Sequence, residues 1–146
     1  MTRTGWIDFG ILIAMRMKGF PMREEQVNKE IVVEAYQRTF GDLDVAAIDE
    51  FFSEDFKQHN PTIADGPEGV KELVRTLSAQ GVKKQKIEFK HIIAEGDVVI
   101  LHSRYEMAGA EWRFIDIYRV ENGRLAEHWD AMMQMPEARA NSNSMF

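Results

Sequence analysis

The sequence predicts an α+β domain in which helices come first and an antiparallel sheet follows. Two observations lead to this prediction. Before Gly81 the apolar residues recur at spacings of three to five, as on one side of a helix, whereas after Gly81 they alternate with polar residues, as in strands. The chain has 146 residues, the size of one domain, and no repeat or linker divides it.

Three helices are expected in the first part of the chain, with start and stop signals between them. Gly41 ends the first helix, and Pro67 is well placed in the first turn of the last one. The pair Asn60-Pro61 marks a turn after a short extended segment. The expected ranges are 24–40, 45–52 and 67–79 for the helices and 56–59 for the short strand.

Four further strands are expected in the second half of the chain, as an antiparallel meander. Hairpin signals separate them, and the strongest is the pair Asn122-Gly123. The expected ranges are 86–94, 98–107, 111–120 and 124–134. The residues that alternation places on one face of the first of these strands are Ile87, Phe89, His91 and Ile93.

The strand at 111–120 carries the most informative pattern. Alternation puts Asp116 on one face with Trp112, Phe114 and Tyr118. A carboxylate among aromatic side chains is unfavourable unless it is paired or functional, and desolvation there would raise its pKa. Asp116 is therefore either a proton-transfer group or the ion-pair partner of a neighbouring arginine such as Arg104.

The last strand places His128, Asp130 and Met132 on one face. His128 and Asp130 either point into the same cavity as Asp116 or form a polar pair at the rim of the sheet. Methionines in such a stretch belong more often to a core or an interface than to a chemical site.

Three more polar residues have both a functional and a structural interpretation. His59 and Asn60 stand at the end of the short strand, where turn hydrogen bonds explain most asparagines. His102 is either a ligand-binding group or a buried histidine that is bonded to a carboxylate.

Composition excludes several classes of function. The chain has no cysteine, which removes disulfide scaffolds, thiolate metal sites and cysteine nucleophiles. Its net charge of −6 argues against a nucleic-acid partner. No His-x-His or His-x₃-His spacing supports a zinc site, so neither a metal nor another cofactor is expected.

Residues 1–21 form an extension ahead of the expected domain. The apolar run from Trp6 to Met17 is too short to span a bilayer, and Asp8 near its start argues against a signal peptide. The extension is either a packing arm, for which a partner subunit is a fair target, or a segment upstream of a second start at Met22. We expect a domain at 22–136, a polar tail at 137–146 and a cytoplasmic location without membrane contact.

Four short segments carry a further signal. They are Gln58-His59-Asn60-Pro61, Gly66-Pro67-Glu68-Gly69, the run DIYRVENGR at 116–124, and Glu127-His128-Trp129-Asp130. Together they resemble the SnoaL-like polyketide cyclase family, which belongs to the nuclear-transport-factor-2-like superfamily together with ketosteroid isomerase and scytalone dehydratase. The resemblance covers residues 24–135.

The resemblance implies a cone-shaped barrel, in which a strongly curved, mainly antiparallel sheet wraps around the N-terminal helices and encloses an apolar pocket. It also implies cofactor-independent acid–base chemistry next to a carbonyl, such as aldol-type cyclisation or isomerisation. The substrate would be a small-to-medium apolar carbonyl compound. The alternative is a non-catalytic ligand-binding or dimerisation module of the same fold.

On this basis Asp116, His128 and Asp130 are expected to be catalytic, with the identity of the base left open and Glu127 as a third candidate carboxylate. The enzyme hypothesis requires Asp116, His128 and Asp130 to converge in one cavity. The residues expected to bind the substrate are His59, Asn60, Tyr36, His102, Trp112, Phe114, Tyr118 and Met132.

A homodimer is expected to form through the outer face of the sheet. Four apolar side chains would otherwise be exposed there. These are Val99, Leu101, Ile115 and Ile117.

Overall fold

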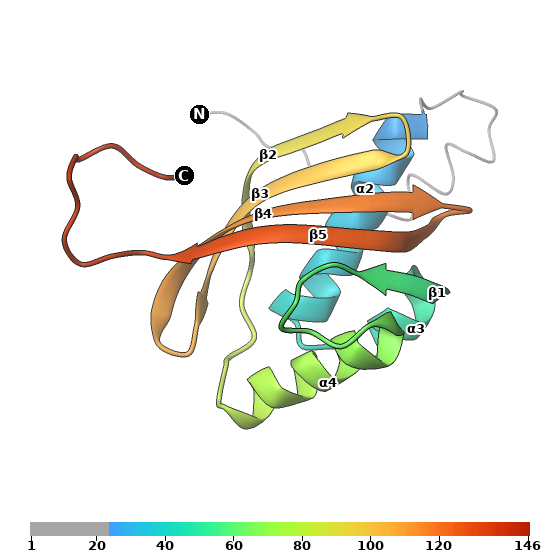
Figure 1. The fold of residues 1–146 in the computed structure, drawn as a ribbon, viewed down its shortest axis with the longest axis horizontal. Coiled ribbons are helices and arrows are strands. Elements are labelled where there is room, and N and C mark those ends of the chain that lie inside the picture. The colour runs from blue at the N-terminus through green and yellow to red at the C-terminus, as the bar shows by residue number, and fades with distance from the viewer. Residues whose placement is uncertain (1–23) are drawn as a thin grey trace.

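Three α-helices and five strands make up residues 24–146, the part of the chain that the computed structural model describes (Figure 1). The helices are α2 (Glu24–Tyr36), α3 (Ala46–Phe51) and α4 (Gly66–Ala79), and a π-helical turn η1 (Gln37–Gly41) continues α2. The strands are β1 (Phe52–Gln58), β2 (Glu88–Glu95), β3 (Val98–Met107), β4 (Ala110–Glu121) and β5 (Arg124–Gln134). The predictions for residues 1–21 lie outside the described residues.

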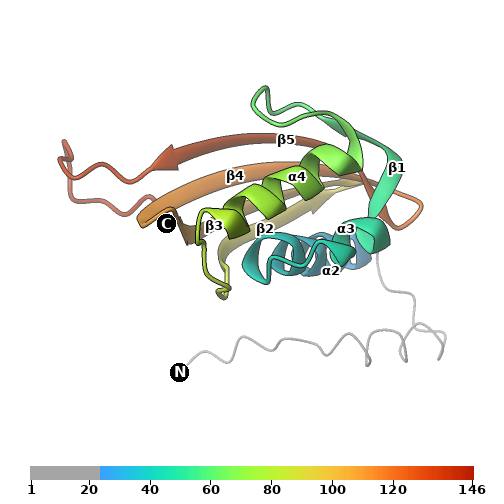
Figure 2. The ribbon, with the colours of Figure 1, turned by 90° about the horizontal axis from the view of Figure 1, so that it is seen from below.

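The five strands form one sheet in the order β1-β5-β4-β3-β2. Strands β2 to β5 make the predicted antiparallel meander, whereas β1 runs parallel to β5. The helices α2, α3 and α4 lie together on the concave face of this curved sheet (Figure 2). The two edge strands of the described sheet do not pair with each other, so the predicted cone is open rather than a closed barrel.

The core lies between the helices and the inner face of the sheet. Alternation decides which strand residues reach it: on β3, Val99, Leu101 and Ser103 are fully buried while the residues between them are only partly covered. Helix α4 contributes Val70 and Val74 from its apolar stripe. The prediction that Val99 and Leu101 belong to an exposed outer face is therefore wrong, although Ile115 is 42% exposed there.

Strand β2 departs from simple alternation. Its pairing with β3 shifts between Phe89 and His91, where a bulge adds one residue to β2. After the bulge Ile92 pairs with the buried Leu101, while Ile93 is 54% exposed. The predicted face that joined Phe89 with His91 and Ile93 is wrong for this reason, because one extra residue reverses every later side chain.

The start of α4 packs tightly against the loop that follows β1. A side-chain carbon at Gly69 would clash with the backbone oxygen of Ala64, so only glycine allows this approach. Pro67 stands in the first turn of the helix, as predicted. This close packing holds the loop at 59–65 against the N-terminal end of α4.

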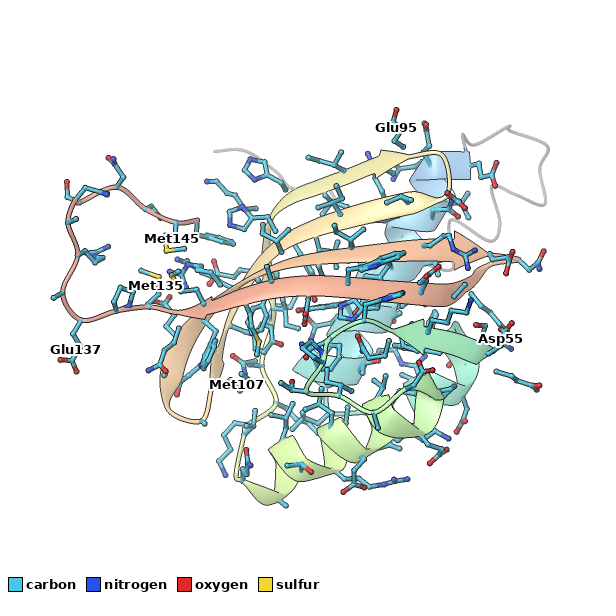
Figure 3. The ribbon with its side chains drawn as sticks, in the orientation of Figure 1. Asp55, Glu95, Met107, Met135, Glu137 and Met145 are labelled. Carbon is cyan, nitrogen blue, oxygen red and sulfur yellow. The ribbon has the colours of Figure 1, made fainter. Side chains whose placement is uncertain are left out.

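The chain turns back after β5, and its last residues lie against the outer face of the sheet (Figures 1 and 3). The backbone oxygen of Met145 accepts a hydrogen bond from His102 at 2.8 Å. The ring of Phe146 lies 4.4 Å from the guanidinium of Arg104, within the range of a cation–π contact. Across residues 24–146 the helices are too short or too polar to cross a membrane.

Candidate active site

A cavity of about 110 Å³ lies between the inner face of the sheet and the helices. Its apolar wall comes from Phe40, Phe52, Phe56, Ile63, Val70, Leu73, Leu77, Met107, Phe114 and Met132. Its polar groups belong to Tyr36, Gln58, Asn60, Thr62, Tyr105, Asp116, Tyr118, His128 and Asp130. Lysine and arginine are both absent from this lining, so the cavity presents carboxyl groups and one imidazole without a cation.

Asp116 sits at the centre of the polar groups. It lies in the middle of β4, where its neighbours in register are Leu101 on β3 and Asp130 on β5. Its Oδ1 is 3.0 Å from Nε2 of His128, and its Oδ2 accepts a hydrogen bond from the hydroxyl of Tyr36 at 2.9 Å. Asp116 and His128 are only 3% and 4% exposed, so this is a buried pair.

Burial raises the pKa of the Asp116 carboxyl above its ordinary value, and the nearby Asp130 carboxylate adds to the rise. The hydrogen bonds from His128 and Tyr36 act in the opposite direction, because they stabilise the ionised form. Burial is the largest of these causes, so Asp116 retains a proton to higher pH than an exposed aspartate does. A carboxyl group of this kind can donate a proton near neutral pH.

Three tyrosines surround this carboxyl group. Burial, together with the charge of Asp116, raises the pKa of Tyr36, Tyr105 and Tyr118 above the ordinary phenol value. Their hydroxyl groups therefore remain protonated, and Tyr36 keeps the hydrogen that it donates to Asp116. The ring of Tyr118 also stacks on His128 at a centroid distance of 4.4 Å, which fixes the plane of the imidazole.

Asp130 faces the cavity from β5, and the loop after β1 holds it. The side-chain nitrogen of Asn60 lies 2.8 Å from both carboxylate oxygens of Asp130. The amide orientation of Asn60 is fixed because its oxygen accepts hydrogen bonds from the backbone and the hydroxyl of Thr62. Asn60 is itself buried, whereas Asp130 is half-buried.

Gln58, at the end of β1, completes the polar cluster. Its Oε1 is 2.9 Å from Nδ1 of His128 and also accepts the backbone N–H of Asn60. The parallel pairing of β1 with β5 brings Gln58 opposite His128 in register. Because parallel partners must come from segments that are distant in the chain, this contact joins residues that are 70 positions apart.

The structure brings most of the predicted site residues together. Asp116, His128 and Asp130 converge in one cavity, which is what the enzyme hypothesis requires. The proposed ion pair between Asp116 and Arg104 is wrong, because Arg104 points to the other face and binds Glu88 at 2.8 Å. The predicted substrate-binding residues that line the cavity are Tyr36, Asn60, Phe114, Tyr118 and Met132.

Three predicted substrate-binding residues lie elsewhere. His59 neighbours Asn60 on the chain, so it points to the opposite side, where its Nε2 meets Glu127 at 2.8 Å. His102 lies on the outer face, 3.1 Å from Nδ1 of His91. Trp112 is on the inner face but packs beside Phe114 beyond the cavity lining.

Gln58 and the α4 side chains Val70, Leu73 and Leu77 line the cavity although the sequence analysis does not predict them as site residues. The signal for Gln58 was present, since alternation places it on the same side as Asn60 and opposite His59. The sequence does not indicate that β1 pairs with β5. Without that pairing, nothing in the sequence predicts that Gln58 and His128 lie close together. Glu127, the third candidate carboxylate, points away from the cavity and pairs with Arg119 at 3.0 Å.

Within residues 24–146, Asp116, His128 and Asp130 also form the group that could hold a metal ion. Ligand atoms of Asp116, His128 and Asp130 lie within 4.8 Å of one another. A cation bound there would replace the hydrogen bond between Asp116 and His128, which has an ordinary length of 3.0 Å. The donor set of one imidazole and two carboxylates suits several divalent ions.

Comparisons with known proteins agree with this geometry. The sequence profile of a SnoaL-like domain matches residues 33–128. The fold is similar to that of TsrD from Streptomyces laurentii, with a TM-score of 0.63 and 19% identity over 76% of this chain and 91% of that one. A search of curated proteins finds no match.

Two further solved structures share the fold. One is a proposed polyketide cyclase from Acidithiobacillus ferrooxidans, with a TM-score of 0.62 and 18% identity over 76% of this chain and 91% of that one. The other is IdmH, a proposed polyketide cyclase from Streptomyces antibioticus, with a TM-score of 0.59 and 19% identity over 72% of this chain and 91% of that one. At these identities the similarity establishes the fold and leaves the chemistry to the residues of the cavity.

Proposed function

Because this chain belongs to the SnoaL-like domain family, we propose that it is a cofactor-independent enzyme that moves protons next to a carbonyl group. The reaction class is aldol-type cyclisation or isomerisation. The relatives described as polyketide cyclases support this class, since they share the fold that carries the cavity. The observation that carries the proposal is the convergence of Asp116, His128 and Asp130 in one apolar cavity.

The two carboxyl groups differ in how they are bonded, and this difference suggests their roles. Both oxygens of Asp116 are engaged, by Tyr36 and His128, and burial raises its pKa. Asp130 meets only the amide nitrogen of Asn60 in this cluster, which leaves lone pairs free on both oxygens. We therefore assign Asp130 as the base that removes the proton from carbon.

The buried pair then serves as the acid. As negative charge develops on the carbonyl oxygen, the proton between Asp116 and His128 is transferred to it or shared with it, which stabilises the enolate. In an isomerisation, Asp130 gives the proton that it removed to another carbon of the enol, and the shared proton returns to the buried pair as the carbonyl reforms. In a ring closure, the enol carbon attacks a second carbonyl, Asp130 protonates the alkoxide that forms there, and the shared proton returns to the pair as the first carbonyl reforms. The apolar wall keeps water from the enolate.

The lining also indicates the class of substrate. A cavity with two carboxyl groups and no lysine or arginine disfavours phosphates, carboxylates and other anions. Aromatic and aliphatic side chains supply the rest of the surface, which favours an apolar body. We propose a neutral, small-to-medium apolar carbonyl compound as the substrate.

The experiment is exchange of hydrogen for deuterium next to the carbonyl, followed by NMR in D₂O. A panel of neutral aromatic and polyketide-like ketones is first screened by thermal shift, since a ligand of the native state raises the melting temperature. Ketones that bind are then tested for exchange with wild type, Asp130→Asn and the control Asp55→Asn. Asp55 is exposed on β1 and is not among the residues that line the cavity; Figure 3 labels its side chain.

We expect wild type and Asp55→Asn to catalyse exchange and Asp130→Asn to lose it by about a hundredfold or more, the contribution typical of a positioned base. Binding without exchange in the wild type would instead favour the ligand-binding module. Undiminished exchange in Asp130→Asn would remove Asp130 from the role of base.

A further inference from the structure

Gln58 is the one polar residue of the cavity that meets both His128 and the backbone of the loop that holds Asp130. Its side-chain oxygen lies 2.9 Å from the backbone nitrogen of Asn60. A backbone N–H can only donate, so the atom that it meets must be the amide oxygen of Gln58 and not its nitrogen. This contact fixes the orientation of the Gln58 amide without reference to His128.

The same oxygen then fixes the position of a hydrogen on His128. It lies 2.9 Å from Nδ1 of the imidazole, and an amide oxygen can only accept. Nδ1 must therefore carry hydrogen, which is the minor tautomer of a neutral histidine side chain in water. The other ring nitrogen, Nε2, is 3.0 Å from Oδ1 of Asp116.

Between Nε2 and Oδ1 there is room for one hydrogen, and a hydrogen bond needs one. The pair thus holds that proton either as a neutral imidazole with a carboxylic acid or as an imidazolium with a carboxylate. Burial of both groups favours the neutral form, because it places no charge in the cavity. If this proton left, His128 would have one hydrogen for two contacts. With that hydrogen on Nδ1, the lone pair of Nε2 would face a lone pair of the Asp116 carboxylate; with it on Nε2, the lone pair of Nδ1 would face a lone pair of the Gln58 oxygen.

We propose that Gln58 is a positioning residue: by holding hydrogen on Nδ1 of His128, it keeps the second, shared proton between His128 and Asp116. The shared proton is the one that the proposed function delivers to the substrate oxygen, so the catalytic meaning of this assignment rests on that function. The number of hydrogens on His128 and Asp116 is inferred only from the contacts of Gln58 with Asn60 and His128 and of His128 with Asp116.

The other ionisable groups near His128 act on this proton but do not set its position. Tyr118 on β4 stacks on the ring, Tyr36 from α2 bonds to the far oxygen of Asp116, and Asp130 lies on the same strand as His128. The negative charge of Asp130 favours retention of the proton. Gln58 is the group that meets Nδ1.

The test is a two-bond ¹H–¹⁵N NMR spectrum of protein labelled with ¹⁵N-histidine, recorded from about pH 6 to 9. The signals of His128 are assigned by their loss in His128→Asn. In the wild type we expect the spectrum to show hydrogen on Nδ1 of His128, because the Gln58 oxygen that it meets can only accept. A wild-type spectrum with hydrogen on Nε2 alone would overturn the proposal, and this measurement needs no variant to fold.

Two substitutions at the same position sharpen the test. Gln58→Met keeps the length of the side chain but has no acceptor, so nothing holds hydrogen on Nδ1 and hydrogen on Nε2 should become the main form. Gln58→Glu restores an acceptor and should retain hydrogen on Nδ1. Gln26→Met, at an exposed position of α2, is the matched control and should behave as wild type. An unchanged His128 spectrum in Gln58→Met would also overturn the proposal.

Activity separates this inference from the proposed function. If exchange occurs, Gln58→Met should lower kcat by about tenfold or more, shift its pH profile to lower pH and change KM little, since the effect falls on the proton and not on ground-state binding. Unchanged kcat and pH profile in this variant would overturn the positioning role. The expected NMR spectra without any exchange would overturn the proposed function alone.

Discussion

Asp116 owes its properties to neighbours that the sequence indicates only in part. Its place between Phe114 and Tyr118 follows from alternation along one strand, so its burial could be predicted. Its hydrogen bond from Tyr36 joins residues 80 positions apart. That contact depends on how α2 crosses the sheet, which the local pattern does not specify.

The error at His59 has a simple physical origin. His59 was grouped with Asn60 because the two are adjacent, yet adjacent strand residues point to opposite sides. His59 instead stacks on Trp129 at a centroid distance of 4.7 Å. Alternation therefore predicts the side of His59, as it predicts that of Asp116, whereas it fails in β2 beyond the bulge.

The first residue-scale prediction concerns stability and pH. Burial raises the pKa of Asp116 in the folded chain above its ordinary value of 3.8, so folding favours the protonated carboxyl. This contribution to the free energy of unfolding is complete below the ordinary pKa and is lost as pH rises through the folded-state pKa. Asp116→Asn cannot ionise and resembles the neutral acid. Its stability relative to wild type should therefore increase with pH.

Urea unfolding between about pH 4 and 8 measures this difference. Asp55→Asn, at an exposed site on β1, serves as the control and should keep a constant offset from wild type. A pH-independent difference for Asp116→Asn would mean that burial does not govern ionisation at this site.

The second residue-scale prediction concerns Tyr36. Tyr36→Phe removes the hydroxyl that bonds to Asp116 but keeps the ring, which packs against Phe40 and Tyr105. We expect the free energy of unfolding to fall by about 0.5–1.5 kcal/mol, the net worth of one hydrogen bond. Exchange activity should fall as well, because Asp116 loses one of its two partners. Asp55→Asn, at the exposed site on β1 outside the cavity lining, is the control and should retain activity. Undiminished exchange in Tyr36→Phe would contradict a role for its hydroxyl.

Among the elements, strand β3 was predicted to the residue and β2 was not. The limits of β3 follow from the turn signals that flank it. The bulge in β2 between Phe89 and His91 has no comparable signal, because it depends on the partner strand. The edge strand β1 starts at Phe52, where the sequence predicted the end of a helix.

The prediction at the element scale concerns the start of α4. In Gly69→Ala the new methyl group would clash with the backbone oxygen of Ala64. A backbone atom cannot rotate away as the end of a flexible side chain can, so the loop itself would have to move. We expect a loss of stability of about 1–3 kcal/mol, as for overpacking elsewhere, together with displacement of the loop that carries Asn60 and Thr62. Ser78→Ala, at an exposed position of the same helix, is the control.

Chemical denaturation and an NMR spectrum of the Asn60 side-chain amide report the two effects. If Gly69→Ala is as stable as wild type and the Asn60 signals do not move, the tight contact does not position the loop.

For the whole molecule, the change of period at Gly81 predicts the fold class, and the turn signals between the elements predict their order. The closure of the cone was not predictable from pattern, and the sheet is open between β1 and β2. Curvature and edge pairing are properties of the assembled sheet, so no local stretch of sequence encodes them.

The prediction at this scale is a dimer in solution. Ile93, Ile115 and Met133 are each more than two-fifths exposed on the strands, and a second copy would cover their apolar side chains. Light scattering after size exclusion should give twice the mass of the chain at micromolar concentration. Ile115→Lys should yield a monomer that keeps its fold, whereas Glu72→Lys on α4, its control, should not. A monomeric wild type would refute the prediction.

The parallel pairing of β1 with β5 also affects when the cavity forms during folding. Strand β1 is synthesised early, yet the amide of His59 finds its acceptor, the backbone oxygen of His128, only once the last strand is in place. Contacts of such long range form late in folding. Edge strands are also among the first segments to open in the native state. Hydrogen exchange at the His59 amide would therefore follow the opening of the cavity itself.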